Sequence, residues 1–246
     1  MSSKILSILA LSLLLTSCGS KTATVEEAQF RWNWATKTYE KWAVKTSDNS
    51  GRTEGAQHPS QKNIKADLDG DQKYESYSLK ENIITVTEDG KIVWTSPTAW
   101  KVYDFSLDDS TRDGKADINI SAWRDSNYGS SQPFWEKKND TTLRDHFFVM
   151  KYADNTVKAV WQSSNLESVN QEFTLADLDG DKRKELIVIE NDYKEAQLCH
   201  DTHVAVWKWN EWWFVNVWRS EKWNYCHLRT SGNTITVEKY IYPVKQ

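Results

Sequence analysis

The sequence lacks the features by which several protein classes are recognised. Its 246 residues contain one long apolar run, close to the start, so no membrane span is predicted further along the chain. Basic residues are not in excess, at 31 Lys and Arg against 35 Asp and Glu, which argues against nucleic acid as a partner. Motifs of nucleophile elbows, zinc proteases, phosphate loops and cysteine–histidine catalysis are absent. The chain is therefore not expected to be an enzyme, and a glycosidase built from scattered carboxylates is the alternative.

The N-terminus has the parts of a signal peptide. Lys4 supplies a positive charge, residues 5–15 form a mostly apolar stretch, and residues 15–17 lead directly to Cys18. The stretch is too short to cross roughly 30 Å of hydrocarbon. A cleavage site that ends in cysteine resembles the bacterial lipobox. The resemblance implies removal of residues 1–17 and acylation of Cys18, which then anchors the protein in a membrane.

The compartment follows from this anchor. Gly19 and Ser20 carry no acidic retention signal, which in a Gram-negative cell predicts the periplasmic face of the outer membrane. Lys4 is the only charged residue before Cys18, so the mature chain has 30 basic and 35 acidic residues and a net charge of −5. An ordinary secretory signal with an incidental cysteine is the alternative.

Cysteine is scarce, and only Cys199 and Cys226 remain in the mature chain. An even pair in an oxidising compartment predicts a disulfide. The neighbouring His200, His203 and His227 offer zinc ligands, although their spacing follows no established zinc pattern. A zinc site and two free thiols are therefore the alternatives.

The segment after the signal peptide is predicted to be a helix. Its apolar residues recur at steps of three and four, as on one face of an amphipathic helix. They are Val25, Ala28, Trp32, Ala35, Tyr39 and Trp42. Residues 46–60 are polar and rich in turn formers, which predicts a connector. The region 18–60 is thus expected to hold the lipidated N-terminus, the helix and the connector. The helix packs on the following domain, or alternatively binds a partner.

Residues 61–246 are dominated by a threefold repeat. Each copy has an acidic loop, a short strand, and a hairpin whose second arm ends in Val-Trp-x-Ser. The loops are residues 67–75, 109–117 and 177–185; the strands are 76–79, 118–121 and 186–189; the tetrapeptides are 93–96, 160–163 and 217–220. The hairpins are expected to turn at residues 89–90, 154–155 and 210–211.

Each copy predicts a four-stranded antiparallel meander: one strand entering the acidic loop, one leaving it, and the hairpin. The third hairpin has apolar residues on both faces, as a sheet stacked between neighbours requires. Residues 225–240 add strand that completes the array. The predicted fold is all-β, a small propeller-like array of four-stranded antiparallel blades with an N-terminal helix. A curved β-sandwich is the alternative.

The acidic loops predict calcium sites. Counting from the first Asp, oxygen-bearing side chains stand at positions 1, 3, 5 and 9, and hard oxygen ligands in a flexible loop suit calcium better than zinc or magnesium. These residues are Asp67, Asp69, Asp71 and Glu75; Asp109, Thr111, Asp113 and Asp117; and Asp177, Asp179, Asp181 and Glu185. The alternative is a turn held by internal hydrogen bonds without metal, favoured most in the second loop, where Thr111 replaces a carboxylate.

An EF-hand is excluded, because position 12 holds Ser78, Ile120 or Val188 instead of Glu, and strand formers follow. The loops instead resemble the FG-GAP or VCBS repeat, the calcium loop of integrin-α-like propellers, over residues 61–220. The resemblance implies a calcium-dependent β-propeller. The first and third loops depart from the family pattern, because they have Gln72 and Lys182 at position 6, where the family has glycine, and glycine at position 4 instead.

The longest predicted connections, at residues 122–145 and 191–203, lie on the rim opposite the acidic loops. Long loops on a rigid scaffold commonly bind partners. The first carries residue types enriched at interface hot spots: Trp123, Arg124, Tyr128, Phe134 and Trp135. The alternative is that these aromatic side chains pack the loop onto the domain.

These patterns predict a membrane-anchored, calcium-binding lipoprotein that acts as a protein-binding module in the cell envelope. The architecture is similar to that of periplasmic inhibitor or immunity lipoproteins, which implies a secreted peptidoglycan-degrading effector as the partner. Two alternatives remain: a glycan- or peptidoglycan-binding lipoprotein that stacks Trp on sugar rings, and a structural or adhesion element.

Overall fold

The computed structural model describes residues 23–46, 55, 58–126, 140–195 and 199–242. These residues form an all-β structure of four four-stranded antiparallel sheets and one short 3-10 helix, η2 (Tyr193–Glu195). Sheet 1 contains β3 (Gln61–Ala66), β4 (Glu75–Lys80), β5 (Ile83–Glu88) and β6 (Lys91–Thr95). Sheet 2 contains β7 (Lys101–Asp108), β8 (Asp117–Ser126), β9 (Asp140–Ala153) and β10 (Thr156–Gln162).

Sheet 3 contains β11 (Val169–Ala176), β12 (Glu185–Asn191), β13 (His203–Asn210) and β14 (Trp213–Arg219). Sheet 4 has the order β15 (Tyr225–Ser231), β16 (Thr234–Ile241), β1 (Thr24–Asn33) and β2 (Thr38–Thr46). Sheets 1 to 3 are the three predicted meanders. Sheet 4 joins the two ends of the chain, because β16 pairs with β1 from Thr24–Ile241 to Arg31–Thr234.

The predicted N-terminal helix is wrong, since residues 24–46 form the hairpin β1–β2. Ala28, Phe30 and Trp32 alternate along β1 on the face that packs against sheet 3, whereas Val25 lies on the other face beside Tyr240. The three-and-four spacing of a helix arose because the apolar residues of this segment are spread over both faces of β1, the turn and β2. Pairing with β16 decided the structure, and the strand-favouring Val, Phe, Trp and Tyr of this segment agree with it.

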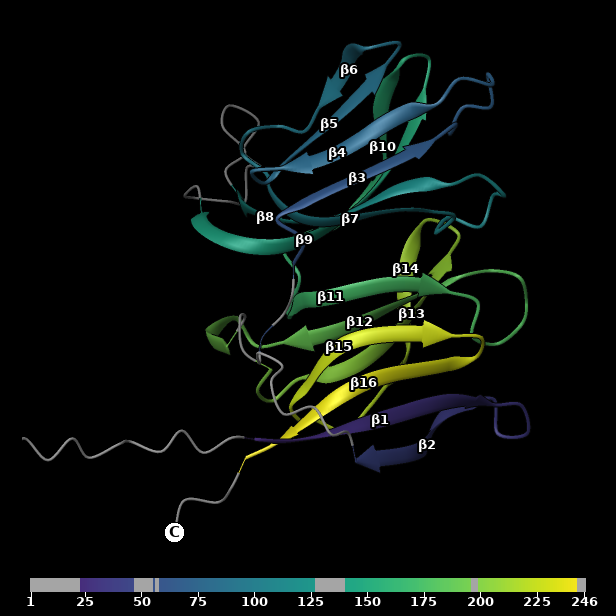
Figure 1. Cartoon of the computed structure of the whole chain (residues 1–246), viewed down its shortest axis with the longest axis vertical. Coiled ribbons are helices and arrows are strands. Elements are labelled where there is room, and N and C mark those ends of the chain that lie inside the picture. Colours follow the sequence, from purple (N-terminus) through teal and green to yellow (C-terminus); the bar gives the residue numbers. More distant parts are fainter. Residues whose placement is uncertain (1–22, 47–54, 56–57, 127–139, 196–198, 243–246) are drawn as a thin grey trace, which may run out of the picture.

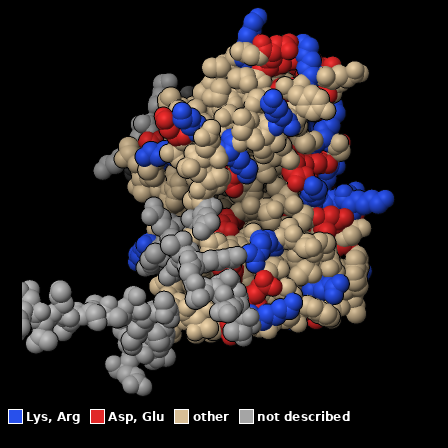
Figure 2. Space-filling view, viewed as in Figure 1, with Lys and Arg blue, Asp and Glu red and all other residues tan. Residues whose placement is uncertain are grey.

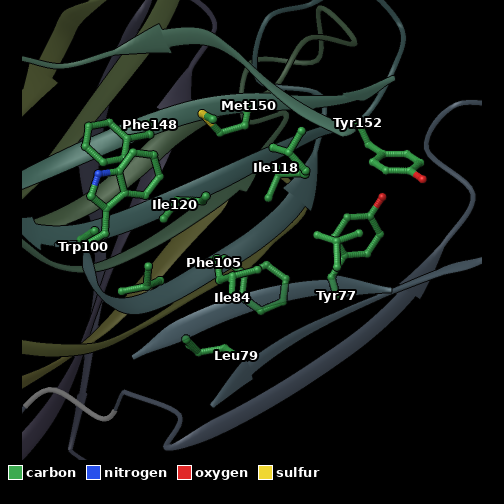
Figure 3. Packing of buried hydrophobic residues seen from close by; sticks show 14 residues of the cluster. Tyr77, Leu79, Ile84, Trp100, Phe105, Ile118, Ile120, Phe148, Met150 and Tyr152 are labelled. Carbon is green, nitrogen blue, oxygen red and sulfur yellow. The ribbon is translucent and has the colours of Figure 1, made fainter. Parts of the chain in front are cut away.

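The sheets stack in chain order along the long axis of the molecule (Figure 1). Strand β9 shows why: Phe148 and Met150 pack into the core between sheets 1 and 2, while Phe147 and Val149 pack into the core between sheets 2 and 3. The first of these cores appears in Figure 3, with Tyr77 and Tyr152 approaching each other at its edge. Strand β12 divides its residues in the same way, and all seven are buried.

The stack ends where strands turn a polar face outward. In β4, the buried Tyr77 and Leu79 alternate with the partly exposed Ser76 and Ser78. In β1, Gln29 and Arg31 alternate with Ala28 and Phe30 in the same way. Within the described ranges, no hydrophobic core cluster joins sheet 1 to sheet 4. Among the described residues, the three shared cores therefore lie between sheets 1 and 2, sheets 2 and 3, and sheets 3 and 4.

The repeated Val-Trp-x-Ser motif completes each of sheets 1 to 3. Its serine hydroxyl accepts a hydrogen bond from a backbone N–H of the third strand, 3.0 Å away in each sheet; the pairs are Ile84–Ser96, Phe147–Ser163 and Val204–Ser220. Its tryptophan (Trp94, Trp161 or Trp218) packs against the core shared with the next sheet. One short motif thus terminates a sheet and attaches it to its neighbour.

A disulfide joins Cys199 to Cys226, with a Cα–Cα distance of 5.6 Å. Both residues are buried. Cys199 precedes β13 and Cys226 lies in β15, so the disulfide links sheet 3 to sheet 4. It is the predicted pair.

Replacing Cys226 with serine is expected to lower the free energy of unfolding by about 3 kcal/mol, because a cross-link between residues 27 apart restricts the unfolded chain. Urea unfolding followed by tryptophan fluorescence measures the change. Dithiothreitol should destabilise the wild type by a similar amount and leave C226S unaffected. An unfolding midpoint of the wild type that does not respond to reductant would contradict this role.

Candidate metal centre

The three acidic loops connect the first and second strands of sheets 1, 2 and 3, and they lie on one rim of the molecule, at the right of Figure 1. Acidic and basic side chains lie side by side along this edge (Figure 2). The hairpins turn where the sequence predicts. Positive φ angles occur at Asp89 and Gly90, at Asp154 and Asn155, and at Glu211.

The loop of sheet 1 is shaped by hydrogen bonds from its own backbone. The Asp67 carboxylate accepts from the N–H groups of Gly70 (2.7 Å) and Gln72 (3.0 Å), and Asp71 accepts from that of Lys73 (2.8 Å). Gly70 and Gln72 both have positive φ. This turn gathers four carboxylates, so that one oxygen from each lies within 4.8 Å of the others; they belong to Asp67, Asp69, Asp71 and Glu75.

Glu75 lies at the base of this group and is fully buried. Its Oε2 accepts hydrogen bonds from the Leu68 N–H (3.1 Å) and the Tyr77 hydroxyl (2.9 Å). Its Oε1 is buried and has no hydrogen-bond partner among the described residues. Burial raises the pKa of Glu75, and the negative charges of the neighbouring aspartates raise it further. A cation at this position would satisfy the oxygen and offset the charges.

The loop of sheet 3 repeats the same turn. Asp177 accepts from the N–H groups of Gly180 (2.7 Å) and Lys182 (3.0 Å), as Asp67 does in sheet 1. Asp177, Asp179 and Glu185 bring their oxygens within 4.8 Å of one another, and Asp181 is not in this group. The surroundings differ, because Lys208 pairs with both Asp179 and Glu185.

The loop of sheet 2 has another organisation. Asp117 Oδ2 accepts four hydrogen bonds of 2.9–3.0 Å, from the backbone and hydroxyl groups of Ser110 and Thr111. Lys151 pairs with Asp113 and lies 3.8 Å from Asp117 Oδ1. Asp109 accepts only backbone N–H groups, including that of Gly114 at 2.9 Å. Among the described residues this loop forms no group of metal-binding oxygens like those of sheets 1 and 3.

The predicted partner-binding residues are only partly described. Trp123 lies in β8, half-buried and edge-to-face with Tyr193 at 5.7 Å between ring centroids. Arg124 donates to the Asp125 carbonyl at 3.1 Å. The other three predicted contacts, Tyr128, Phe134 and Trp135, lie outside the described residues, as does Cys18. Within the described ranges, the structure contains no apolar helix of membrane-spanning length.

A second polar and aromatic surface lies at the β1–β2 turn, and the sequence pattern had placed its tryptophans on a helix. A cleft of about 420 Å³ is lined there by Arg31, Trp32, Asn33, Trp34, Ala35, Glu40, Trp42 and Asn233. Trp42 is 63% exposed, and the guanidinium of Arg31 lies 4.9 Å above its ring. Asn233 holds Arg31 by a 3.0 Å hydrogen bond.

No protein-family model matches this chain, and no curated protein matches it either. The fold and these sites define it as an all-β protein of four four-stranded sheets with an acidic rim.

Trp34, which lines the cleft at the β1–β2 turn, lies against Gly180 of the sheet 3 loop. Gly180 and Gly70 hold the same loop position, with φ of +75° and +81°. A Cβ at Gly180 would lie 3.1 Å from the Trp34 ring, whereas nothing lies within 4 Å of one at Gly70. Both alanine variants carry the backbone cost of about 1 kcal/mol. Thermal unfolding should show G180A destabilised by about 1 kcal/mol more than G70A, because its methyl group displaces Trp34.

Adding Trp34→Ala to G180A should remove this difference. Equal stability of the two glycine variants would show that the Trp34 contact contributes nothing.

Proposed function

We propose that this protein is a calcium-binding lipoprotein, anchored through Cys18, that acts as a protein-binding module in the cell envelope. The observation that carries the calcium proposal is the loop of sheet 1. Three aspartate carboxylates are gathered there beside the buried Glu75 carboxylate, whose Oε1 has no hydrogen-bond partner among the described residues. Close pairs of like charge repel by about 1 kcal/mol even in high dielectric, and a divalent cation offsets that repulsion.

Calcium suits this group better than other metals. All its side-chain ligands are carboxylate oxygens, with no nitrogen or sulfur among them. Oxygen ligands on a flexible loop accept the large and irregular coordination sphere of calcium, whereas magnesium demands a near-ideal octahedron. The expected dissociation constant is about 10⁻⁴ to 10⁻³ M, as in extracellular modules.

The arrangement of the sheets agrees with the resemblance to FG-GAP and VCBS repeats. Each of sheets 1 to 3 is a meander whose acidic loop joins its first two strands. We take the four sheets as the blades of a propeller-like array, with the fourth completed by β1 and β2. Such a scaffold holds its connecting loops rigidly, which favours a role in binding.

The protein partner is proposed for the rim opposite the acidic loops. The long connection joins β8 to β9, and these two strands are paired from Ile118–Met150 to Ser126–Asp140. Trp123 stands at this end of β8. A secreted peptidoglycan-degrading effector is the partner class, because it shares the compartment that the lipid anchor implies.

Calcium at ten times its dissociation constant is expected to stabilise the chelator-treated protein by about 1.4 kcal/mol, which corresponds to about 3–6 °C in melting temperature. Differential scanning calorimetry measures the shift, with magnesium at the same concentration as the control. Glu75→Gln should abolish it. A melting temperature that does not respond to calcium would refute the calcium proposal.

The second candidate function is binding of peptidoglycan glycan, and the cleft at the β1–β2 turn favours it. Trp34 and Trp42 expose more than three-fifths of their surface beside the polar side chains of Arg31 and Glu40. Indole faces stack on the apolar faces of sugar rings, while planar polar groups bond to their hydroxyls. The cleft thus offers both kinds of contact that a saccharide needs.

Two substitutions distinguish the two candidates. If a protein is the partner, Trp123→Ala should weaken capture of an envelope effector at least tenfold and leave retention on purified peptidoglycan unchanged. If glycan is the ligand, Trp42→Ala should weaken that retention about tenfold, the loss of one stacking contact. Trp212→Ala is the matched control, since Trp212 is 65% exposed but does not line the cleft. Equal losses of effector capture or of peptidoglycan retention in all three variants would argue against both Trp123 and the cleft as binding sites.

A further inference from the structure

We propose that only the loop of sheet 1 binds calcium, and that in sheets 2 and 3 a lysine of the third strand takes the place of the ion. These lysines are Lys151 and Lys208. The inference rests on the proposed function, because it assigns that function's calcium to one of three similar loops. It also predicts the stoichiometry, one ion per chain.

Strand register places one residue of the third strand opposite the ninth position of each loop. Leu186 pairs with Trp207 in sheet 3, so the next step along the strands brings Glu185 opposite Lys208. Ile118 pairs with Met150 in sheet 2, which brings Asp117 opposite Lys151. In sheet 1 the pair Ser76–Thr87 brings Glu75 opposite Glu88. The same structural position therefore holds a cation in two sheets and an acid in one.

The lysines contact the groups that a metal ion would bridge. Lys208 pairs with Asp179, at position 3 of its loop, and its Nζ lies 3.4 Å from Glu185 Oε1, at position 9. Lys151 pairs with Asp113, at position 5, and its Nζ lies 3.8 Å from Asp117 Oδ1, again at position 9. A metal ion that entered either loop would have to displace the ammonium group of Lys208 or Lys151 from these carboxylates.

Sheet 1 offers the contrasting case. Glu88 is buried, and its Oε2 accepts a hydrogen bond from the Tyr152 hydroxyl at 2.9 Å. Within the described part of the chain, no lysine or arginine forms an ion pair with the four carboxylates of this loop. Lys151 borders the cleft beside Asp69, but its ammonium lies on the carboxylates of sheet 2.

The Oε1 atom of the glutamate at position 9 has different surroundings in sheets 1 and 3. Glu185 Oε1 has Lys208 at 3.4 Å and Arg112 at 3.5 Å. Glu75 Oε1 has no hydrogen-bond partner within the described ranges, although its residue is fully buried. Both glutamates otherwise accept the same backbone bond, from Leu178 and Leu68. The positive charge missing at Glu75 is what a bound calcium ion supplies.

Calcium counting tests the assignment. The full-length protein, purified in detergent and treated with chelator, is dialysed to equilibrium against millimolar calcium chloride, and bound calcium is measured by atomic emission. We expect one ion per chain. Asp71→Asn should remove it and Asp181→Asn should keep it. The two variants are matched, because each aspartate accepts a 2.8 Å bond from the backbone N–H two residues on, and asparagine retains that acceptor.

A charge exchange tests the role of the lysines. Glu88→Lys should reduce bound calcium from one ion to none, and Lys208→Met should increase it from one to two. Lys158→Met is the control, because Lys158 pairs with Asp154 away from the loops, and it should leave one ion. If Glu88→Lys fails to fold by circular dichroism, the gain in Lys208→Met decides.

The outcomes separate the two proposals. No bound calcium in the wild type would overturn the proposed function itself. Two or three ions in the wild type, or one ion lost in D181N and kept in D71N, would overturn this inference and leave the calcium-binding function intact. An unchanged count in Lys208→Met would show that the lysine does not hold the place of an ion.

Discussion

Sheets 2 and 3 must bury both of their faces, and the rest of the molecule follows from that constraint. Successive residues of β9 and β12 enter different hydrophobic cores, so each strand connects two layers at once. A polar substitution at any of residues 186–189 of β12 would therefore disrupt a core. In the outer sheets, serine residues of β4 and glutamine and arginine residues of β1 alternate with the buried apolar residues, and they end the series. The repeat is thus a packing unit that depends on its neighbours.

Stacking also brings the acidic loops to one edge, where their charges act on one another. Arg112 of the sheet 2 loop reaches Glu185 of sheet 3 at 3.5 Å, and Lys184 of the sheet 3 loop reaches Asp108 of sheet 2 at 2.6 Å. The loops of sheets 2 and 3 are therefore joined by ion pairs. Sheet 1 contacts sheet 2 through apolar packing, the Tyr152–Glu88 hydrogen bond and the Lys62–Asp104 ion pair, and among the described residues its acidic loop takes part in no ion pair with sheet 2. The acidic loops of sheets 1 and 3 are nearly identical in sequence, but they consequently have different electrostatic surroundings.

Much of this fold was predictable, because its signals are local. The meanders, the turns at residues 89–90 and 154–155 and the serine motif all depend on residues close in sequence. Two features were not. The β1–β2 hairpin depends on β16, about 200 residues away, and its two-sided apolar pattern imitates a helix. The residues opposite the loops lack a fixed sequence offset: Glu88 directly precedes its turn, whereas Lys151 stands three residues before Asp154. Only the strand register identifies them as equivalent.

The composition of sheet 4 controls when folding finishes. β1 is synthesised long before β16, so the edge of β1 that pairs with β16 has no partner until β16 has been made, although its other edge pairs with β2. A chain truncated before Thr234 leaves Ala28 and Phe30 without the neighbouring strand that helps to cover them. Sheet 4 thus closes only in a polypeptide that has been synthesised through β16.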